Sequence, residues 1–491
     1  MRFLFAILCL AGTLARAAAP QPDLVLRGRL DGADHQTYRT APFAVPAGVQ
    51  RLTVAFSYDG REQRSVIDLG LLGPDGAVVG WSGGNKSVFT VSAVDATPSY
   101  LPTPTRAGEW ALLLGVPNLR KEAHADYTAQ VWFSRTLDAA DEPAVLAPPV
   151  KTGPGWYRGD LHSHTGHSDG SCAPLGGGKA LPCPLFLTAQ AAAARGLDFV
   201  AITEHNTVSH ASSIRELQPY FAQMLLMPGR EVTGFQGHAN LFGTLAPLDF
   251  RVVRGRRDWS AVLRDVPARG LVAVNHPVRP SGEDCMGCGW DDLEALRLVQ
   301  AVEVVNGRDA DTPWSGIPFW QAALDRGLRL TAIGGSDNHH ADAADPRQGI
   351  ASPTTVVYAA ELSQPAIVAA IRAGHVFVDV EGTRERMLAL EARAGERRAL
   401  MGDTLAPPAG TPVRFALRLQ HVRGARPVVL LDGVPGQWLA EAAVDSDDRT
   451  LSFAWQADGK PHTVRAEVRD AQGKLLMLGN PIHIDRPDAS R

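Results

Sequence analysis

The sequence lacks an excess of basic residues, since 48 Lys and Arg stand against 52 Asp and Glu, with a formal net charge of −4. It therefore lacks the electrostatic footprint of a nucleic-acid-binding protein. It also has no internal repeat, and no segment is biased enough to predict disorder. After the first residues, no apolar run is long enough to cross a bilayer. These absences favour a folded, soluble protein for which nucleic acid is an unlikely partner.

Cysteine is also scarce, with five residues in the chain. The first lies in the apolar N-terminal segment, and the others are Cys172, Cys183, Cys285 and Cys288. An oxidising compartment favours two disulfides, either Cys172–Cys183 with Cys285–Cys288 or a crossed pairing. A zinc site built from all four cysteines is the alternative, because the C-x-x-C spacing of the last two suits zinc.

The N-terminus has the pattern of a secretory signal peptide. Arg2 precedes an apolar run from Phe3 to Leu14, and Ala15-Arg16-Ala17 fits the small-x-small rule of signal peptidase. The apolar run is too short to serve as a membrane anchor. We therefore predict a signal peptide over residues 1–17 and a periplasmic or secreted mature chain, with no membrane anchor after cleavage.

At 491 residues the chain is longer than one hydrophobic core usually organises. Residues 20–137 alternate short β-type runs with turn residues, which predicts an N-terminal β-sandwich. Residues 138–155 are rich in proline and acid, as in a linker. Residues 156–382 alternate apolar strand candidates with helical segments, among them WDDLEALRLV at residues 290–299, which is the pattern of a parallel sheet or barrel. Residues 383–487 return to β-type runs and predict an immunoglobulin-like β-sandwich. The fold class is thus multidomain α/β plus β.

Metal-ligating residues lie where the predicted central strands end. The segment GDLHSHTGHSDG, residues 159–170, carries a His-x-His pair whose side chains project to the same side of an extended chain. Further candidates close or follow the later strands. The full candidate set is His162, His164, Asp169, His205, Glu231, His238, His276, Asp337 and His339. Imidazole and carboxylate together suit zinc, manganese or iron rather than calcium or copper(I).

The motifs DLHSHT…SDG, TEHN, PGREVT, GHANLFG, NHP and GSDNH together resemble the PHP (polymerase and histidinol phosphatase) superfamily. The added β-domains and the predicted export resemble its carbaryl-hydrolase branch, CehA/McbA. The resemblance covers residues 156–382 and implies a distorted (β/α)7 barrel flanked by the two β-sandwiches, with two or three divalent ions at the strand ends. By motif, His162, His164, Glu231 and Asp337 would hold the first ion. Glu231 would bridge to a second ion bound by His238 and His276, and Asp169, His205 and His339 match a third position.

Such a site generates hydroxide between two cations, so no protein nucleophile is required. Glu231 and Asp337 would be catalytic through the ions they hold. His167 and His340 are the free imidazoles nearest in sequence and are candidates to protonate the leaving group. The alternative is that they hydrogen-bond to a metal ligand or lie on the surface. Arg230, Arg279, Asn240 and Asn306 are candidates for binding a small-molecule substrate, and the arginines make an anionic substrate one of the options. Ordinary surface, turn and capping roles are the alternative for these four.

The reaction predicted is that of a phosphoesterase. One alternative is hydrolysis of a carbamate, ester or amide, in line with the carbaryl-hydrolase resemblance. A second is a 5′–3′ exonuclease-like phosphodiesterase, which the acidic net charge disfavours. A non-catalytic binding protein with a degenerate barrel is the fourth, and the complete ligand set argues against it.

Overall fold

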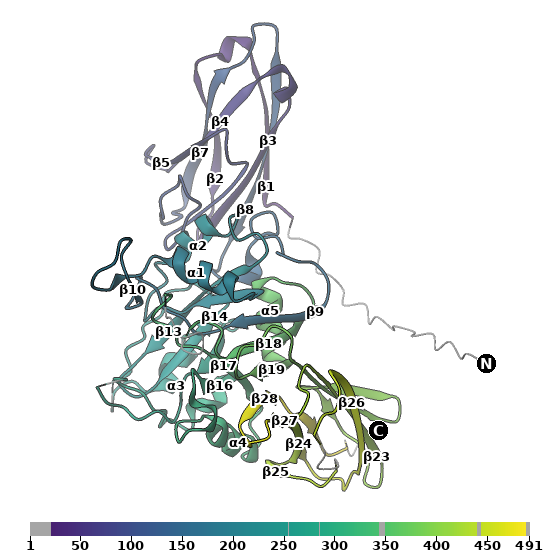
Figure 1. Ribbon diagram of the computed structural model, residues 1–491. Helices are drawn as coiled ribbons and strands as arrows, with labels where there is room; N and C mark the ends of the chain where they lie inside the picture. The colour runs from purple at the N-terminus through teal and green to yellow at the C-terminus, as the bar shows by residue number, and fades with distance from the viewer. Residues whose placement is uncertain (1–20, 254, 284, 343–348, 439–442, 488–491) are drawn as a thin grey trace, which may run out of the picture.

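A computed structural model describes residues 21–253, 255–283, 285–342, 349–438 and 443–487. The predicted signal peptide lies outside the described residues. Three parts follow one another along the molecule: N-terminal strands at one end, a central sheet with helices, and C-terminal strands at the other end (Figure 1). No helix among the described residues has the length and apolar character that a membrane span requires.

The N-terminal part consists of two antiparallel four-stranded sheets around one core. Apolar and polar residues alternate along these strands, so that one side of each sheet faces the core. In YRTAPFAV the side chains of Ala41, Phe43 and Val45 are buried while their neighbours are exposed. One sheet has the order β1 (Leu24–Asp31), β8 (His124–Ser134), β3 (Arg51–Tyr58) and β6 (Val88–Ser92). The other has the order β2 (Tyr38–Val45), β7 (Gly108–Asn118), β4 (Val66–Leu72) and β5 (Val78–Gly83). Three 3-10 turns, η1 (Gly32–Asp34), η2 (Arg61–Gln63) and η3 (Ala139–Asp141), lie in the connections.

The central strands form one curved run in the order β17 (Thr331–Gly335), β16 (Ala301–Asn306), β15 (Leu271–Val274), β14 (His238–Phe242), β13 (Leu225–Thr233), β12 (Phe199–Ile202), β9 (Gly155–Asp160), β18 (Thr354–Ala359) and β19 (Val376–Asp379). The run curves so that the segments after β9 and β17 meet. Asp337 N donates to His162 O and His164 N donates to Asn338 O, both over 2.9 Å. Residues beyond two distant strands are thereby placed side by side.

The pairing differs from uniform strand–helix repeats. β9, β12 and β13 are parallel, as are β15, β16 and β17, but β14 is antiparallel to both of its neighbours. Only residues 234–237 separate β13 from β14, which leaves room for a hairpin and not for a crossover helix. β18 is also antiparallel to β9. The expectation of a purely parallel sheet is therefore corrected to a mixed sheet.

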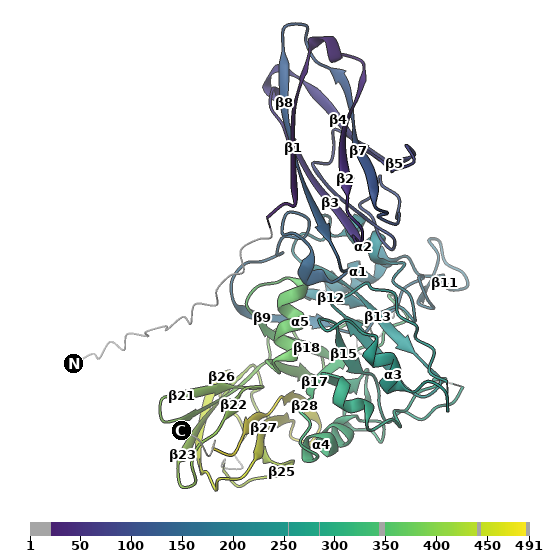
Figure 2. The same cartoon turned by 180° about the vertical axis from the view of Figure 1, so that it is seen from behind.

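The helices α1 (Leu185–Ala194), α2 (Ala211–Leu217), α3 (Trp259–Arg264), α4 (Ile317–Asp325) and α5 (Gln364–Arg372) lie outside the curved run, as the reverse view shows (Figure 2). Their buried residues join the strand residues in shared cores. The expected helix at residues 290–299 is reduced to a 3-10 turn, η4 (Ala295–Leu298). The side chain of Asp292 accepts a hydrogen bond from Ala295 N, and the turn begins only at Ala295, five residues into the segment. Another 3-10 turn, η5 (Asp309–Asp311), precedes α4.

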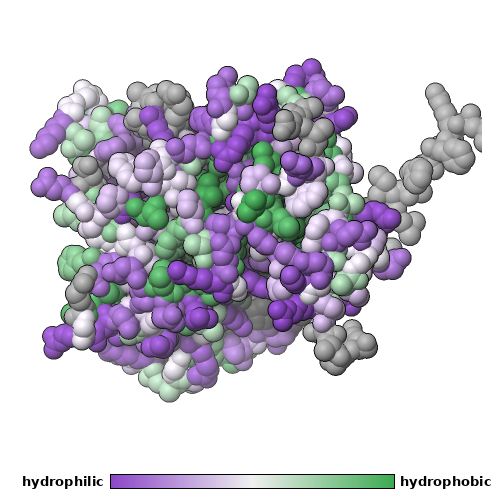
Figure 3. Space-filling view, turned by 90° about the horizontal axis from the view of Figure 1, so that it is seen from below, coloured by the Kyte–Doolittle hydropathy of each residue, from purple (hydrophilic) through white to green (hydrophobic). Residues whose placement is uncertain are grey.

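The C-terminal strands form two sheets that share one core. One has the order β21 (Arg397–Leu400), β20 (Met387–Ala394), β23 (Pro412–Gln420) and β26 (Asp448–Gln456). The other has the order β28 (Leu475–Gly479), β27 (His462–Arg469), β24 (Arg426–Leu431) and β25 (Val434–Pro435), with β22 (Thr404–Leu405) and β29 (Ile482–Ile484) beside it. Because β28 pairs with β19, this second sheet continues the central one. The face seen from below is mostly hydrophilic, with hydrophobic residues in small separate patches (Figure 3).

Candidate metal centre

The nine predicted ligands converge on one end of the central strands. His162 and His164 follow β9, His205 follows β12, and Asp169 lies on the loop after His164. Glu231 lies within β13 and His238 opens β14, so the hairpin brings these two residues together. His276 follows β15, and Asp337 with His339 follow β17. The curvature of the sheet thus collects side chains that are far apart in the sequence.

Glu231 is the hub of the centre. Its carboxylate is buried, with 1% of the side chain exposed, and it faces five imidazoles. The nitrogen–oxygen distances are 3.4 Å to His162, 3.5 Å to His164, 2.9 Å to His205, 3.2 Å to His238 and 3.4 Å to His276. One carboxylate cannot accept well-directed hydrogen bonds from five rings at once. The arrangement suits a carboxylate shared between cations.

Two further carboxylates complete the centre. Asp337 Oδ1 lies 3.2 Å from Nε2 of both His162 and His164. Asp169 lies 3.5 Å from His205 and 3.3 Å from His339. Each carboxylate therefore stands between two imidazoles, which is the arrangement expected around an ion.

Three groups of these residues place one ligand atom from each member within 4.8 Å of the others. They are His162, His164 and Asp337; His162, Glu231 and His276; and His164, Asp169, His205 and His339. The third group includes His164, which the motif resemblance assigns to the first ion. The group around Glu231 lacks the predicted His238 and includes His162, so the groups share imidazoles and follow the predicted assignment only in part.

Unpartnered polar atoms provide a test of the fit to metal ions. Nε2 of His162, Nε2 of His164, Oε2 of Glu231 and Nδ1 of His276 are buried and have no hydrogen-bond partner. A buried polar atom without a partner costs roughly 1–3 kcal/mol. Several such atoms gathered in one place fit a centre whose remaining partners are ions.

The local electrostatics favour positive charge. Burial lowers the pKa of His162, but Asp337, Glu303 and Glu231 together raise it well above its ordinary value. For His205, burial also opposes the charged form, yet Asp169 and Glu231 raise its pKa to about 10. The histidines in turn hold the pKa of Glu231 well below its usual range despite burial. Burial lowers the pKa of His164 to about 4, so this ring stays neutral and keeps a lone pair for a ligand bond.

Two ligands have backbone conformations that residues with side chains rarely adopt. His276 has φ +25° and Asp337 has φ +54°, and Asn206, which follows the ligand His205, has φ +56°. Such conformations cost on the order of 1–3 kcal/mol each and persist where the surroundings impose them. Strained backbone is therefore found at the ends of three different strands, next to the predicted ligands.

Three buried acids that are not among the predicted site residues hold the predicted ligands and the segments beside them. Glu303 contacts His162 Nδ1 over 3.0 Å and accepts from His276 N over 3.0 Å. Glu204 accepts from the hydroxyls of Thr165 and Ser168. Asp160 accepts from the backbone of His162, Ser336 and Ala351. A charged residue inside an apolar strand, as in AVEVVN, is the sequence signal that would have found Glu303.

The proposed proton donors have serine partners. His167 Nδ1 lies 2.9 Å from Ser209 Oγ, and burial lowers its pKa. His340 is exposed, and its Nδ1 lies 3.1 Å from Ser171 Oγ. Their part in catalysis remains a prediction.

The four candidate substrate-binding residues divide into two groups. Arg230 lies on the opposite side of β13 from Glu231, is buried, and donates to Ala246 O over 2.9 Å. Asn240 is buried and donates to Leu161 O. Both side chains are buried, and their part in substrate binding stays a prediction.

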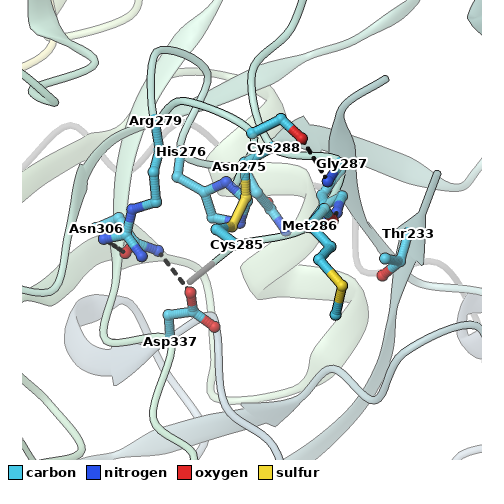
Figure 4. The surroundings of a disulfide bond; sticks show 12 residues. Thr233, Asn275, His276, Arg279, Cys285, Met286, Gly287, Cys288, Asn306 and Asp337 are labelled. Carbon is cyan, nitrogen blue, oxygen red and sulfur yellow. Dashed lines mark hydrogen bonds between the residues drawn. A yellow bond between two sulfur atoms is a disulfide. The ribbon is translucent and has the colours of Figure 1, made fainter. Parts of the chain in front are cut away.

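Arg279 and Asn306, by contrast, lie beside Asp337 (Figure 4). Arg279 donates to Asn306 Oδ1 over 2.8 Å and to Asp309 Oδ2 over 2.6 Å. Asn306 donates to Asp337 Oδ2 over 3.3 Å. The arginine is a quarter exposed, so a guanidinium group faces solvent beside a predicted ligand.

The structure joins Cys172 to Cys183 and Cys285 to Cys288. The first disulfide closes the loop of β10 (Ser171–Cys172) and β11 (Leu181–Pro182), where Ser171 N donates to His339 O. The second lies beside His276 (Figure 4). Both cross-linked loops therefore border the metal ligands.

Comparisons with known proteins give little. No family model matches the chain, and no curated protein matches it. Among solved structures, the chain is similar to a two-domain protein from Bacteroides vulgatus that contains a predicted PHP-like metal-dependent phosphoesterase. That similarity has 19% identity and a TM-score of 0.37, and covers 67% of this chain and 96% of the other. Likeness at this level assigns neither family nor function.

Proposed function

We propose that the protein is a metal-dependent hydrolase that cleaves phosphate esters with two or three divalent ions, of the zinc, manganese or iron class. The observation that carries the proposal is the buried Glu231 carboxylate with five imidazoles 2.9–3.5 Å away. When bound, neighbouring divalent ions would polarise the ester and lower the pKa of a water molecule. The set of nitrogen and carboxylate donors suits these ions.

The chain's own residues hold the ligands in position. Glu303 binds the far nitrogen of the His162 ring and so leaves Nε2 directed at Glu231 and Asp337. Asn275 donates to Glu231 Oε1 over 2.9 Å and fixes that carboxylate. Such outer contacts set the tautomer and the orientation of metal-bound rings.

Arg279 is the residue that favours an anionic substrate. Its guanidinium group has five donor N–H bonds, and the contacts with Asn306 and Asp309 engage only one of its terminal nitrogens, Nη2. The remaining donors suit the oxygens of a phosphoryl group, which arginine binds in a two-pronged manner. This placement supports a phosphate ester over a neutral carbamate.

The test is to express the mature chain, measure its bound metals, and assay a phosphate monoester, a phosphate diester and an aryl carbamate side by side. We expect phosphate ester hydrolysis that a chelator abolishes and that manganese, zinc or iron restores. A metal-free protein that stays inactive after reconstitution would refute every enzymatic function. Turnover of the carbamate alone would refute the phosphoesterase and favour a carbamate, ester or amide hydrolase.

A further inference from the structure

A fourth group of metal-ligating side chains lies beside the centre and includes two cysteines. His238, His276, Cys285 and Cys288 each place one ligand atom within 4.8 Å of the others. All four residues are buried or half-buried. Nδ1 of His276 is buried and has no hydrogen-bond partner, although the other nitrogen of the ring faces Glu231. A ligand on the cysteine side would therefore meet a free, buried nitrogen.

The CMGC loop, residues 285–288, is held against the β13–β14 hairpin. Gly237 N donates to Gly287 O over 2.7 Å, and His238 Nε2 contacts Met286 O over 3.2 Å. Gly287 has φ +84°, and a Cβ at this position would lie 2.2 Å from Gly234 O. Only glycine lets the loop approach this closely. Figure 4 shows both cysteines beside His276, with Met286 and Gly287 between them in the loop.

Two thiolates and two imidazoles are a preferred donor set for zinc, and the C-x-x-C spacing is common in zinc sites. In the structure the two sulfurs are bonded to each other. If the disulfide were reduced, the loop would present two separate thiolates at the same place. The oxidation state of Cys285 and Cys288 therefore decides whether two sulfur ligands are available to a metal ion.

We propose that, when the Cys285–Cys288 disulfide is reduced, these cysteines bind a zinc-class cation together with His238 and His276. This proposal rests on the proposed function in one respect: the two histidines are also the predicted ligands of the second ion beside Glu231. An ion held by the two thiolates and two imidazoles has four protein ligands and no open position. Reduction would therefore create a closed site that shares the His276 ring with the second ion, through the nitrogen that does not face Glu231.

The redox step can be carried out by a phosphine. The phosphorus gives two electrons to the S–S bond and ends as a phosphine oxide with an oxygen from water. The two sulfurs receive the electrons, and the protons of that water convert them to thiols. Metal binding then displaces these protons.

The experiment uses cobalt(II), because thiolate ligation gives a strong near-ultraviolet charge-transfer absorption that imidazole and carboxylate ligation lack. The full-length mature chain is stripped of metal and titrated with cobalt in its oxidised and phosphine-reduced forms. The test variant is Cys285→Ser with Cys288→Ser. The matched control is Cys172→Ser with Cys183→Ser, which removes the other disulfide.

We expect the absorption in reduced wild-type protein and in the reduced control, at one cobalt per chain, with zinc displacing it. It should be absent from oxidised wild type and from the test variant. His238→Gln should weaken cobalt binding in the reduced protein by at least about tenfold. Reduced wild type without the absorption would overturn the proposal, and so would an absorption that survives in the test variant.

The outcome is independent of hydrolysis. An inactive protein that shows the absorption would refute the hydrolase and leave the thiolate site in place. An active protein without the absorption would refute the thiolate site and leave the hydrolase in place.

Discussion

The metal centre and the contact between the N-terminal sheets and α2 both bury several charges, but they balance them differently. At the contact, Arg51 and Asp95 are fully buried 2.8 Å apart, and Arg215 on α2 pairs with Asp95 and Glu142. Two guanidinium groups thus meet two carboxylates. At the metal centre, the ion pairs described for Glu231, Asp337 and Asp169 all have histidine partners. The first cluster carries its own permanent cations, and the second relies on groups whose charge depends on protonation.

This difference is the reason why we propose ions at only one of the two clusters. A permanent guanidinium group neutralises a buried carboxylate and also repels a metal. Histidine can give up its proton and use the same nitrogen as a ligand. Buried carboxylates with histidine partners alone are therefore a better sign of a metal site than buried charge as such.

The largest expected effect comes from removing a carboxylate of the centre. Asp337→Asn takes the charge from between His162 and His164. A metal ion contributes several kcal/mol to transition-state stabilisation, so we expect turnover to fall by about 10³-fold. Steady-state kinetics measure this, with circular dichroism to verify folding. Turnover within about threefold of wild type would contradict a ligand role.

The same substitution in the other cluster should affect stability instead. Asp95→Asn leaves Glu142 as the single carboxylate beside two buried guanidinium groups, and breaking such a buried pair costs about 3–5 kcal/mol. Burial raises the pKa of Asp95, but Arg215 and Arg51 lower it further, to well below its usual range. Its contribution is therefore present above the unfolded pKa of about 3.9 and is lost as the pH falls toward the lower folded value. Denaturant unfolding at neutral and acidic pH measures both effects, and metal content should stay unchanged.

A smaller effect is expected from Glu303, which positions His162 and is not itself a predicted ligand. Glu303→Gln weakens the contact with Nδ1 and should reduce metal affinity by about 10–100-fold. Metal titration with a competing chelator gives the affinity. If Glu303→Gln abolished binding altogether, Glu303 would be a ligand and not a positioning residue.

Metal binding should also depend on pH. Carboxylates raise the pKa of His205 to about 10 and that of His162 well above its ordinary value, so both rings hold protons at neutral pH. A metal must displace these protons, and its affinity should rise about tenfold per pH unit for each proton released. Calorimetry in buffers with different ionisation enthalpies counts the protons. Binding without proton release would show that the rings are already neutral.

Much of the centre could be predicted from the sequence, because its ligands lie at the ends of apolar runs. The His-x-His pair after β9 and the Asp-x-His pair after β17 are local patterns. Their meeting depends on the curvature of the sheet, which local patterns do not specify. Glu303 was not predicted as a site residue because its sequence neighbours are apolar. A charged residue inside a buried strand needs a partner, and this requirement is the signal that points to it.

Two predictions about the fold were wrong, and the sequence contains the signals that explain both. Gly234 and Gly237 bracket the short link before His238, which is a hairpin signal and not that of a crossover. Asp291 and Asp292 favour a cap over a helix interior, which shortens the predicted helix at residues 290–299. The proximity of the CMGC loop to His238 had no local signal, because it arises from contact between the loop and the hairpin.

The central claim is that Glu231 is shared between ions, and metal stoichiometry tests it most directly. Wild type, Glu231→Gln and the matched Glu142→Gln variant are reconstituted with manganese or zinc, desalted and analysed for bound metal. We expect two or three ions in wild type and in Glu142→Gln, and the loss of at least one ion from Glu231→Gln. A Glu231→Gln protein with the full wild-type metal content would contradict the account.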